Sequence, residues 1–595
     1  MSTEKHFINT AQELVLDSLK GFVSTNSHLK LDEENKVVYL KNIDQVKENQ
    51  VTLFSGGGAG HEPSHAGFIG PGLLSAAVSG HVFASPSSSQ VLNCLKRVHS
   101  PKHGTIVIVK NYTGDILNFG RAIERFKALQ ASKNIFDTKV AMVVVGDDVG
   151  VINELEEVDV GRRGLSGTIF VHKIAASAAA AGHTFETVEK IANYVANNVF
   201  TIGCALNPAS VPGSGLPRIL AADQIEFGMG IHNEPGFKTV KLSSAKEIVS
   251  SMVDVVLSSK LFIKSTQNYT SSGNAKRVSL LINNLGALSN LELGLVSNEA
   301  INHTLNSGCQ IAHSFQGTFM TGLAMSGISI SILVHPSTES EFDISKLIDY
   351  PSSAPGWNNH IQVADSSSQS DLAASSDKSA SKDLSNVPNS PNKKIWVNII
   401  DSIYATVKEQ EPKITELDSI MGDGDCGHVL LSGAESVHAA IHSDSIPIDD
   451  TASAISTVSS LLEASMGGTS GAIYCLFFDG VSQHLASLKS NDISHKDWSD
   501  SLSVGLQTIQ RYSTAKVGDR TMVDAIQPFV ESLHSTNFDI NAALQAAIKG
   551  TESTIDMVPL RGRAVYTGKG KGVADAGATG VCAIIQGLAS ALANN

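Results

Sequence analysis

The chain of 595 residues has few cysteines, no CxxC pair and a shortage of positive charge. Its six cysteines are scattered, which argues against a disulfide framework and favours a reducing compartment. Lys and Arg number 44 against 58 Asp and Glu, and the formal net charge of −14 argues against nucleic acid or an anionic membrane as the main partner. An anionic small substrate remains compatible with this charge where metal ions or local cations offset it.

Long apolar runs and an apolar leader are also missing. The longest runs, such as residues 140–145, have the length of a strand and fall short of a membrane span. The first residues, MSTEKHFINT, are polar and charged, which is unlike a signal peptide. Apolar residues still make up 42% of the chain, and its length suggests two to four domains. We therefore expect a soluble, cytoplasmic protein with no membrane partner.

Short apolar runs that each end in a glycine-rich or polar turn predict α/β structure in the first part of the chain. Strand, turn and helix in this order are typical of α/β domains, whose sites lie at the carboxyl ends of the strands. A later apolar run at 278–285 indicates a second lobe. The three earlier runs are 51–54, before SGGGAG, 105–109, before KNYTGD, and 139–145, before GDD.

The composition changes abruptly at residues 361–394, where Ser, Asp, Ala, Asn and Lys predominate and hydrophobic residues almost vanish. Such a segment cannot bury enough surface to fold and is typical of a flexible linker. From residue 395 the apolar residues recur at helical spacing, and strand signals are few. We predict one α/β lobe over 1–195, a second over 196–360, and an all-α domain over 395–595.

One histidine stands between two glycine-containing turns in GMGIHNEPG, residues 228–236. Gly228 and Gly230 remove side chains where another backbone or a small ligand comes close. After His232, Pro235 fixes its own φ and Gly236 tolerates a positive φ, so the chain turns sharply. A histidine presented in this way can be a base, a metal ligand or a nucleophile, or simply a loop side chain bonded to a backbone carbonyl.

The loop FSGGGAGHEPSHAGFIGPG, residues 54–72, contains a string that matches the HExxH zinc motif. That motif needs both histidines on an unbroken helix, whereas glycines precede His61 and Pro63 interrupts the segment, so we reject zinc here. The glycines instead let the main chain wrap a small polar molecule, with His61 pointing into it. Lys110 and Asp115, after the next strong strand, are natural companions, although Asp115 taken alone suits a surface helix cap.

Three aspartates cluster in LDSIMGDGDCGH, residues 417–428. Asp418, Asp423 and Asp425 repel one another unless cations lie among them, so they predict a divalent-metal site. Hard oxygen ligands favour Mg²⁺ that carries phosphates, and the spacing does not continue as an EF-hand. A solvated acidic turn is the alternative.

Further loops fit a nucleotide. MGGTSG, residues 466–471, can present backbone N–H groups and hydroxyls to phosphate. Arg563 and the segment 575–579, DAGAT, lie near the end of the chain. Each signal is weak alone, but together with the aspartates they favour binding of a nucleoside triphosphate.

Seven motifs in this order resemble the dihydroxyacetone (glycerone) kinase family, in its single-chain, ATP-dependent form found in fungi and other eukaryotes. The resemblance implies a substrate-binding half of two α/β lobes, followed by an all-α, nucleotide-binding barrel of helices. The motifs are GGGAGHEPSHAGF, KNYTGD, GRRGLSGT, GMGIHNEPG, MGDGDCG, GGTSG and GDRTMVDA.

The resemblance also implies roles for individual residues. His232 would bind the ketone covalently as a hemiaminal, Asp115 would accept the hydroxyl proton, and His61 would be its partner or an alternate base. Gly58, Ala59, Gly60 and Lys110 would complete the substrate site, and Asp418, Asp423 and Asp425 would bind Mg²⁺. Nucleotide contacts would fall on Cys426, Gly427, His428, Val429, Thr469, Ser470, Met522, Arg563, Asp575, Ala576 and Gly577.

Two departures and three rival functions accompany the resemblance. The family often has Pro where Ala576 stands, and one of its glycine contacts is replaced by Ser513. The implied activity is phosphorylation of dihydroxyacetone and D-glyceraldehyde with ATP and two Mg²⁺ ions, by a homodimer that binds no nucleic acid. The rivals are an FAD-AMP lyase that uses the same nucleotide site, a phosphoprotein-dependent kinase, and a non-enzymatic ketose-binding regulator.

Overall fold

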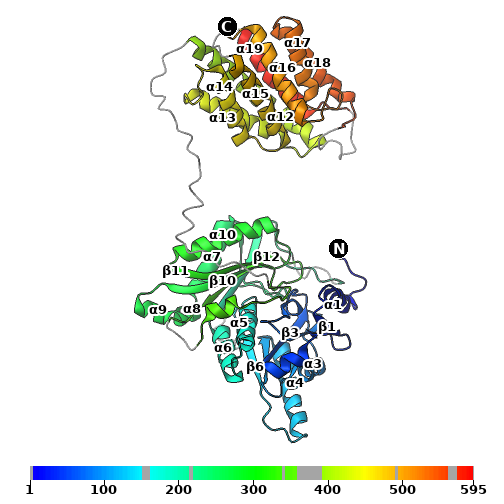
Figure 1. The fold of residues 1–595 in the computed structure, drawn as a ribbon, viewed down its shortest axis with the longest axis vertical. Helices are drawn as coiled ribbons and strands as arrows, with labels where there is room; N and C mark the ends of the chain where they lie inside the picture. The colour runs from blue at the N-terminus through cyan, green and yellow to red at the C-terminus, as the bar shows by residue number, and fades with distance from the viewer. Residues whose placement is uncertain are drawn as a thin grey trace. The chain divides into compact units, whose positions relative to one another are not determined.

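The chain forms two compact units, residues 1–376 and 377–595 (Figure 1). The computed structural model describes residues 5–150, 161–213, 219–337, 342–357, 391–488, 493–560 and 572–593. The predicted linker at 361–394 therefore lies outside the described residues up to residue 390. The first helix of the second unit already begins at Pro391, ahead of the predicted start at residue 395.

The first part of the first unit forms a six-stranded sheet in the order β1-β2-β4-β3-β5-β6. Strands β3, β4, β5 and β6 pair in parallel, and β1, β2 and β4 pair antiparallel. Its elements are α1 (Leu14–Thr25), β1 (Leu29–Asp32), β2 (Val37–Leu40), α2 (Ile43–Asn49), β3 (Thr52–Ala59), η1 (Ala66–Phe68), β4 (Ala76–Val82), α3 (Ser88–Val98), β5 (Thr105–Lys110), α4 (Thr113–Ala131) and β6 (Val140–Val145).

The rest of the first unit forms a second six-stranded sheet in the order β11-β10-β12-β7-β8-β9. Only β10 and β11 pair in parallel, so this sheet is mainly antiparallel. Its elements are α5 (Thr168–Ala180), α6 (Phe185–Asn197), β7 (Val199–Asn207), β8 (Gln224–Phe227), β9 (Lys238–Lys241), α7 (Ala245–Ser258), α8 (Lys260–Ser265), α9 (Gln267–Ser272), β10 (Lys276–Asn284), α10 (Asn290–Asn306), β11 (Cys309–Gly317), β12 (Ser326–Val334) and α11 (Ile344–Asp349).

The central strands of the first sheet are apolar because helices cover them. Helices α3 and α4 contact β4 and β5, and α5 contacts both β3 and β5. Every residue of β3 and β5 is buried. Parallel strands buried on both faces carry continuous apolar runs, which is why TIVIV at 105–109 was a reliable strand signal.

Strand β3 is longer than the sequence suggested. The glycines after Phe54 were expected to end the strand, yet β3 continues to Ala59. It can continue because β4 pairs with it as far as Ala59, although β5 pairs with it only as far as Ser55. A side chain at Gly56 would put its Cβ 2.3 Å from the carbonyl oxygen of Val78 on β4. Glycine here permits close packing between strands rather than breaking the strand.

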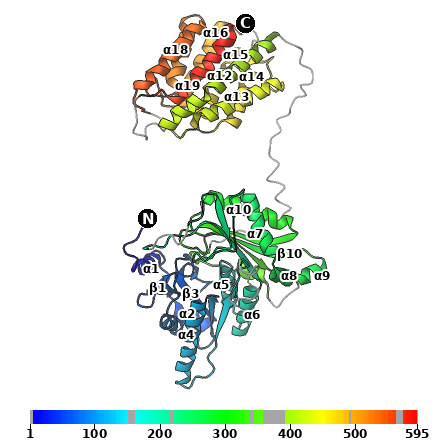
Figure 2. The ribbon, with the colours of Figure 1, turned by 180° about the vertical axis from the view of Figure 1, so that it is seen from behind.

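The second unit is helical in the part that the structure describes (Figure 2). Each helix from α12 to α19 contacts the next along the chain, and α19 contacts α12 to close the ring. The prediction of an all-α barrel after an α/β region is confirmed. The elements are α12 (Pro391–Met421), α13 (Cys426–His442), α14 (Thr451–Ser465), α15 (Gly468–Leu488), α16 (His495–Tyr512), α17 (Val523–Ser535), α18 (Ile540–Ser553), η3 (Thr554–Asp556) and α19 (Ala576–Ala593).

Helix α19 contradicts the expectation that no apolar run approaches membrane-spanning length. With 18 residues it is long and apolar enough to cross a membrane by length and composition. Half of it is buried, and it contacts α12, α13, α17 and α18. Its small residues explain this position, since the absent side chain of Gly587 lets the backbone of Ile403 on α12 come close. These contacts are those of a core helix of the barrel.

Candidate active site

Two histidines from distant parts of the chain meet in the first unit. Nε2 of His61, just after β3, lies 3.0 Å from Nε2 of His232. Nδ1 of His61 donates to the carbonyl oxygen of Thr321 at 2.7 Å, and Nδ1 of His232 donates to Oε1 of Glu234 at 2.7 Å. Because both Nδ1 atoms are donors, the two Nε2 atoms face each other with room for one shared proton. Loss of that proton leaves a lone pair on Nε2 of His232, as a nucleophile requires.

Aromatic rings hold this pair in place. The His232 ring meets Tyr112 and Phe83 edge to face, at centroid distances of 4.7 and 5.3 Å, and the His61 ring stacks on Phe83 at 5.3 Å. His61 is fully buried, whereas 20% of the His232 side chain is exposed. Burial, followed by the nearby His232 and Lys110, holds the pKa of His61 well below its usual value. His61 is therefore neutral and His232 is the more accessible of the two.

Glu234 belongs to the site although no role was predicted for it. Burial alone would raise its pKa, but the hydrogen bond and charge of His232 outweigh burial and lower the pKa to about 2. Its Oε2 also accepts from the backbone N–H of His232 at 2.9 Å. The carboxylate therefore fixes both the orientation and the tautomer of the ring. The signal was present in the sequence, because Glu234 stands two residues after His232 in the same motif.

The turn around His232 differs in detail from the expectation. The positive φ angles are 77° at Gly228 and 67° at Asn233, and Gly236 was wrongly expected to use one. Gly236 is needed for space, since a Cβ there would lie 2.0 Å from the carbonyl oxygen of Phe227. The guanidinium of Arg163, from the GRRGLSGT motif, donates to the carbonyl oxygen of Gly228 at 2.6 Å and anchors the turn.

Lys110 and Asp115 form a second, buried group beside the histidines. Nζ of Lys110 lies 3.7 Å from Oδ2 of Asp115 and 3.0 Å from Nε2 of His65. Ser85 donates its hydroxyl to Oδ1 of Asp115 at 2.5 Å. Burial lowers the pKa of Lys110, and the charge of Asp115 opposes that shift. Asp115 is 3% exposed, so the alternative of a surface helix cap is wrong.

The glycine loop runs past these groups. Gly58, Ala59 and Gly60 are buried at the end of β3 and lead directly to His61. Gly60 has a φ of 97°, and a Cβ there would meet the ring of Phe83 at 2.8 Å. These residues lie at the carboxyl end of a parallel strand, next to β5, which ends at Lys110. The predicted substrate residues are thus brought to one edge of the first sheet.

Replacing Gly57 with alanine should displace Lys110 and lower kcat/KM by about 10²-fold, since misplacing a reacting group by about 1 Å costs that much. A Cβ at Gly57 would lie 2.5 Å from Nζ of Lys110 and 3.4 Å from Oδ2 of Asp115. Gly120→Ala on α4 is the matched control, because nothing lies within 4 Å of its Cβ. Steady-state kinetics of both variants test the expectation, and equal rates would contradict it.

Several rings of the first unit are kept neutral by burial, which predicts a loss of stability in acid. Burial lowers the pKa of His172, whose Nε2 lies 2.9 Å from Nδ1 of His65, to about 3, against 6.5 for a free imidazole. Below about pH 6.5 the imidazole is protonated in the unfolded chain but stays neutral in the folded chain. The free energy of unfolding therefore falls by up to about 1.4 kcal/mol per pH unit for each such ring. His172→Gln should flatten the fall of the melting temperature between pH 7 and 5. An unchanged slope in calorimetry would contradict this.

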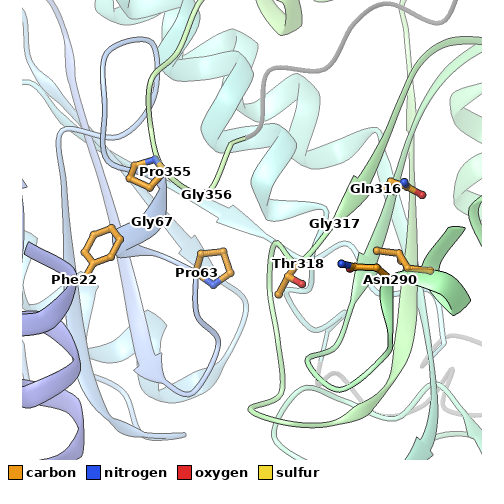
Figure 3. Close-up of a pocket in the computed structure, with 10 residues that line it drawn as sticks. Phe22, Pro63, Gly67, Asn290, Gln316, Gly317, Thr318, Pro355 and Gly356 are labelled. Carbon is orange, nitrogen blue, oxygen red and sulfur yellow. The ribbon is translucent and has the colours of Figure 1, made fainter. Parts of the chain in front are cut away.

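A pocket of about 530 Å³ lies beside the same loop (Figure 3). Pro63 and Gly67 of the loop line it, and none of the predicted substrate residues does. Its other lining residues are Phe22, Asn290, Leu293, Gln316, Gly317, Thr318, Pro355 and Gly356.

The acidic loop of the second unit joins α12 to α13. One carboxylate oxygen from each of Asp418, Asp423 and Asp425 lies within 4.8 Å of the others. Oδ2 of Asp418 accepts from the backbone N–H groups of Asp425 and Cys426, at 3.0 and 3.1 Å. Gly424 has a φ of 79°, which lets the loop turn back. Three carboxylates with no imidazole or thiolate among the clustered ligand atoms fit Mg²⁺ and its preference for oxygen.

Most of the predicted nucleotide residues lie around this loop. Cys426 opens α13, and Ser470, in the first turn of α15, lies within hydrogen-bond reach of its thiol. Burial, followed by the charges of Asp418 and Asp575, raises the pKa of Cys426 to about 12, so the thiol is protonated. Gly427 packs tightly on α12, since a Cβ there would lie 2.2 Å from Oγ1 of Thr415. Val429, Thr469 and His428 follow on the same helices, and the His428 side chain is 71% exposed.

The start of α19 completes this region. Oδ1 of Asp575 accepts from the backbone N–H of Ala578 at 2.9 Å, and burial raises the pKa of Asp575 to about 6. A Cβ at Gly577 would lie 3.4 Å from Cβ of Met522, so Ala576 and Gly577 lie beside the GDRTMVDA motif. Arg520 of that motif, to which no role was assigned, is buried with NH1 3.8 Å from Oδ2 of Asp575. The predicted contact Arg563 lies outside the described residues.

The comparisons with known proteins agree with this arrangement. A model of the Dak1 domain matches residues 20–356, and a model of the DAK2 domain matches residues 420–590. Dihydroxyacetone kinase 2 of Saccharomyces cerevisiae is 37% identical over 597 residues, covering 97% of this chain and 98% of the relative. Triokinase/FMN cyclase of Homo sapiens is 34% identical over 599 residues, covering 99% and 100%.

A crystal structure of the dihydroxyacetone kinase from C. freundii in complex with AMP-PNP and Mg²⁺ is similar throughout. Its TM-score is 0.64 at 30% identity, covering 99% of this chain and 100% of that one. The similarity to dihydroxyacetone kinases over nearly the whole chain shows that it is a kinase, a phosphotransferase. The chain belongs to the dihydroxyacetone kinase family, in its single-chain form.

Proposed function

We propose that this chain phosphorylates dihydroxyacetone and D-glyceraldehyde with ATP, and holds the substrate covalently on His232 during the reaction. The observation that carries this proposal is the pair of Nε2 atoms 3.0 Å apart, each ring oriented by an acceptor at its own Nδ1. A ring held in this tautomer has a free lone pair on Nε2 as soon as the shared proton leaves. The names of the relatives support the substrate class.

Capture of the carbonyl uses the two rings and the carboxylate of Glu234. The lone pair on Nε2 of His232 attacks the carbonyl carbon, and the π electrons move to the oxygen. That oxygen takes up a proton, and His61 is the adjacent base that can hold or relay one. The new bond leaves the ring with a positive charge, so Nδ1 gives its proton to Glu234 and the product is a neutral hemiaminal. A short ketose offers little surface for binding, so a covalent bond provides affinity and excludes glycerol, which has no carbonyl.

The transfer step uses the buried acid group. Asp115 accepts the proton of the substrate hydroxyl as the oxygen attacks the phosphoryl group, and Lys110 compensates its charge. Mg²⁺, when bound at Asp418, Asp423 and Asp425, would stabilise the charge that develops on the phosphates. Two ions, a homodimer and a cytoplasmic location remain predictions.

Replacing His232 with alanine should abolish the covalent adduct and raise KM for dihydroxyacetone, while part of kcat survives because Asp115 remains. The affinity loss should exceed about tenfold, since a small ketose has few other contacts. Intact-mass analysis under non-denaturing conditions measures the adduct, and a coupled ADP assay measures the rate. An adduct that persists in this variant would overturn the assignment.

His313→Ala is a suitable control for that experiment, because His313 is also a buried histidine of the first unit but pairs with Asp349 at 3.1 Å. We expect this variant to keep the adduct. Loss of the adduct in both variants would point to a general effect of histidine removal on the fold.

A second candidate activity is cleavage of FAD on the nucleotide site, favoured by the 34% identity to triokinase/FMN cyclase of Homo sapiens. It would need the acidic loop but not His232. Chromatography of products from FAD with Mn²⁺ or with Mg²⁺, run on wild type and His232→Ala, distinguishes it from the kinase. The intact aspartates argue against a non-enzymatic regulator, and both units in one chain argue against dependence on a separate phosphoprotein.

A further inference from the structure

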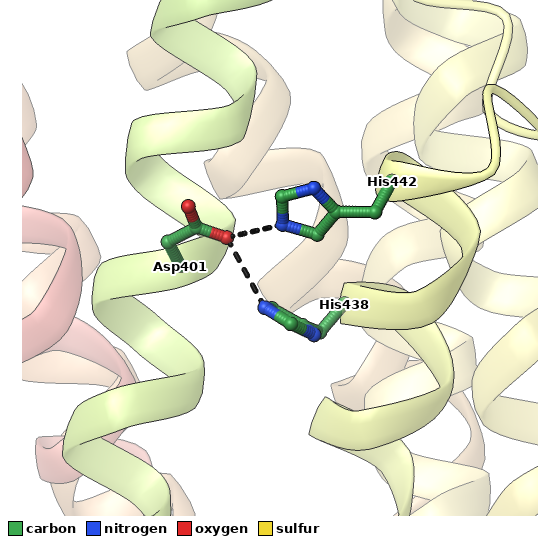
Figure 4. Close-up of side chains that lie close together, drawn as sticks. All are labelled: Asp401, His438 and His442. Atoms are coloured by element: carbon green, nitrogen blue, oxygen red, sulfur yellow. Dashed lines mark hydrogen bonds and ion pairs between the residues drawn. The ribbon is translucent and has the colours of Figure 1, made fainter.

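Three side chains of the helical unit point at one another outside both sites described above (Figure 4). Asp401 lies on α12, and His438 and His442 lie on α13. Nε2 of His442 is 2.8 Å from Oδ1 of Asp401, and Nε2 of His438 is 3.3 Å from the same oxygen. One ligand atom from each residue lies within 4.8 Å of the other two. Both imidazoles therefore converge on a single carboxylate oxygen.

The local structure explains this convergence. Residues four apart on a helix share a face, so His438 and His442 present their rings together, with centroids 4.6 Å apart. Helices α12 and α13 are joined by the short acidic loop and pack against each other, so the start of α12 faces the end of α13. Tyr404, one turn after Asp401, stacks on His438 at 4.4 Å and limits its rotation. The geometry is thus fixed by helix packing and not by a loop.

This cluster is separate from the acidic loop. Asp401 and Asp418 lie on the same helix, and at about 1.5 Å per residue they are about 25 Å apart along its axis. The acidic loop occupies the closed end of the α12–α13 hairpin, whereas the cluster occupies its open end. An ion at one position therefore cannot be shared with the other.

We propose that Asp401, His438 and His442 form a second metal site, which binds a divalent transition-metal ion of the Zn²⁺ class and fastens α12 to α13. Two imidazole nitrogens and one carboxylate oxygen suit Zn²⁺, whereas Mg²⁺ prefers oxygen alone. Tetrahedral Zn²⁺ with bonds of about 2.0–2.1 Å separates neighbouring ligand atoms by about 3.3 Å. The Asp401–His438 separation of 3.3 Å already matches that value.

The Asp401–His442 distance and the exposed fractions are compatible with the same ion. The Asp401–His442 separation of 2.8 Å would open by about 0.5 Å to reach the tetrahedral value. The side chains of Asp401 and His442 are 44% and 48% exposed, so an ion can enter from solvent and keep a water as its fourth ligand. Hydrogen bonds from two neutral rings to Asp401 would produce a similar apo geometry, and the experiment separates these cases.

The test is a titration of the purified full-length protein, freed of metal by a chelator and then kept in excess Mg²⁺ to occupy the acidic loop. Calorimetry with Zn²⁺ gives stoichiometry and affinity, and absorption with Co²⁺ reports tetrahedral coordination by nitrogen. We expect one Zn²⁺ ion to bind per chain in the presence of Mg²⁺, and Co²⁺ to give a visible absorption band. The melting temperature of the helical unit should rise with Zn²⁺, because an ion bound only to the folded state stabilises it.

The variants are His438→Asn, His442→Asn and Asp401→Asn, with His534→Asn as the matched control on an exposed position of α17. Each variant in the cluster should lose at least about tenfold in Zn²⁺ affinity, together with the Co²⁺ band, while the control keeps both. Circular dichroism and kinase turnover should stay unchanged in the absence of Zn²⁺. Absence of Zn²⁺ binding to wild type, or equal binding to wild type and His438→Asn, would overturn the proposal.

Discussion

Replacing Asp115 with alanine is expected to lower kcat by about 10²–10⁴-fold while the covalent adduct on His232 still forms, because a base in reach of the reacting hydroxyl acts only in the transfer step. The carboxylate is buried, accepts from Ser85, and lies 3.7 Å from Nζ of Lys110. Intact-mass analysis of the adduct beside single-turnover kinetics separates capture from transfer. An unchanged kcat would contradict the role of Asp115 as base.

Asp115→Asn tests whether the effect is chemical or structural. An amide keeps the shape of the side chain and an acceptor for Ser85, so a structural role would be rescued and a basic role would not. Glu124→Ala is the control on the same helix α4, since its side chain is 73% exposed and pairs with the nearby Lys127. We expect Glu124→Ala to behave as wild type and Asp115→Asn to resemble Asp115→Ala.

Replacing Asp423 or Asp425 with alanine should reduce turnover with Mg²⁺ and ATP by about 10³-fold or more. Metal-bound phosphate receives several kcal/mol of charge stabilisation in the transition state, and each 1.36 kcal/mol is about tenfold in rate. The oxygens of the three aspartates lie within 4.8 Å of one another, so loss of one breaks a shared ligand set. The measurement is the Mg²⁺ dependence of ADP release.

The same variants should still form the adduct with dihydroxyacetone, because the acidic loop and His232 belong to different compact units. Asp449→Ala, at an exposed acidic position between α13 and α14, is the matched control and should leave the Mg²⁺ dependence unchanged. Wild-type turnover in Asp423→Ala would remove the basis for a metal site in this loop. Loss of the adduct in that variant would instead show that the two units act together in capture.

Several features could be predicted from the sequence because their signal is local. The continuous apolar run at 105–109 predicted β5, and helical spacing after residue 395 predicted the barrel. The spacing of Asp418, Asp423 and Asp425 predicted that their carboxylates cluster, since these residues are close in the chain as well as in space. In each case residues close in the sequence are also close in the structure, so periodicity and spacing are sufficient to predict the feature.

Other features depended on contacts between residues far apart in the chain. Strand β3 passes through its glycines because β4 pairs with it from Phe54 to Ala59, whereas β5 pairs with it only as far as Ser55. The propensity of the segment alone could not indicate that support. His65 meets His172 and Lys110 only because β3, β5 and α5 pack together.

The histidines show most clearly which features the sequence could predict and which depended on the tertiary structure. The motif around His232 marked that residue from the sequence alone, because glycines and a proline next to a histidine report a constrained turn. Its contact with His61 and the convergence of His438 and His442 on Asp401 were decided only by the tertiary structure. A single histidine at helical spacing carries no signal of its partner, since the partner is selected by how one helix packs against another.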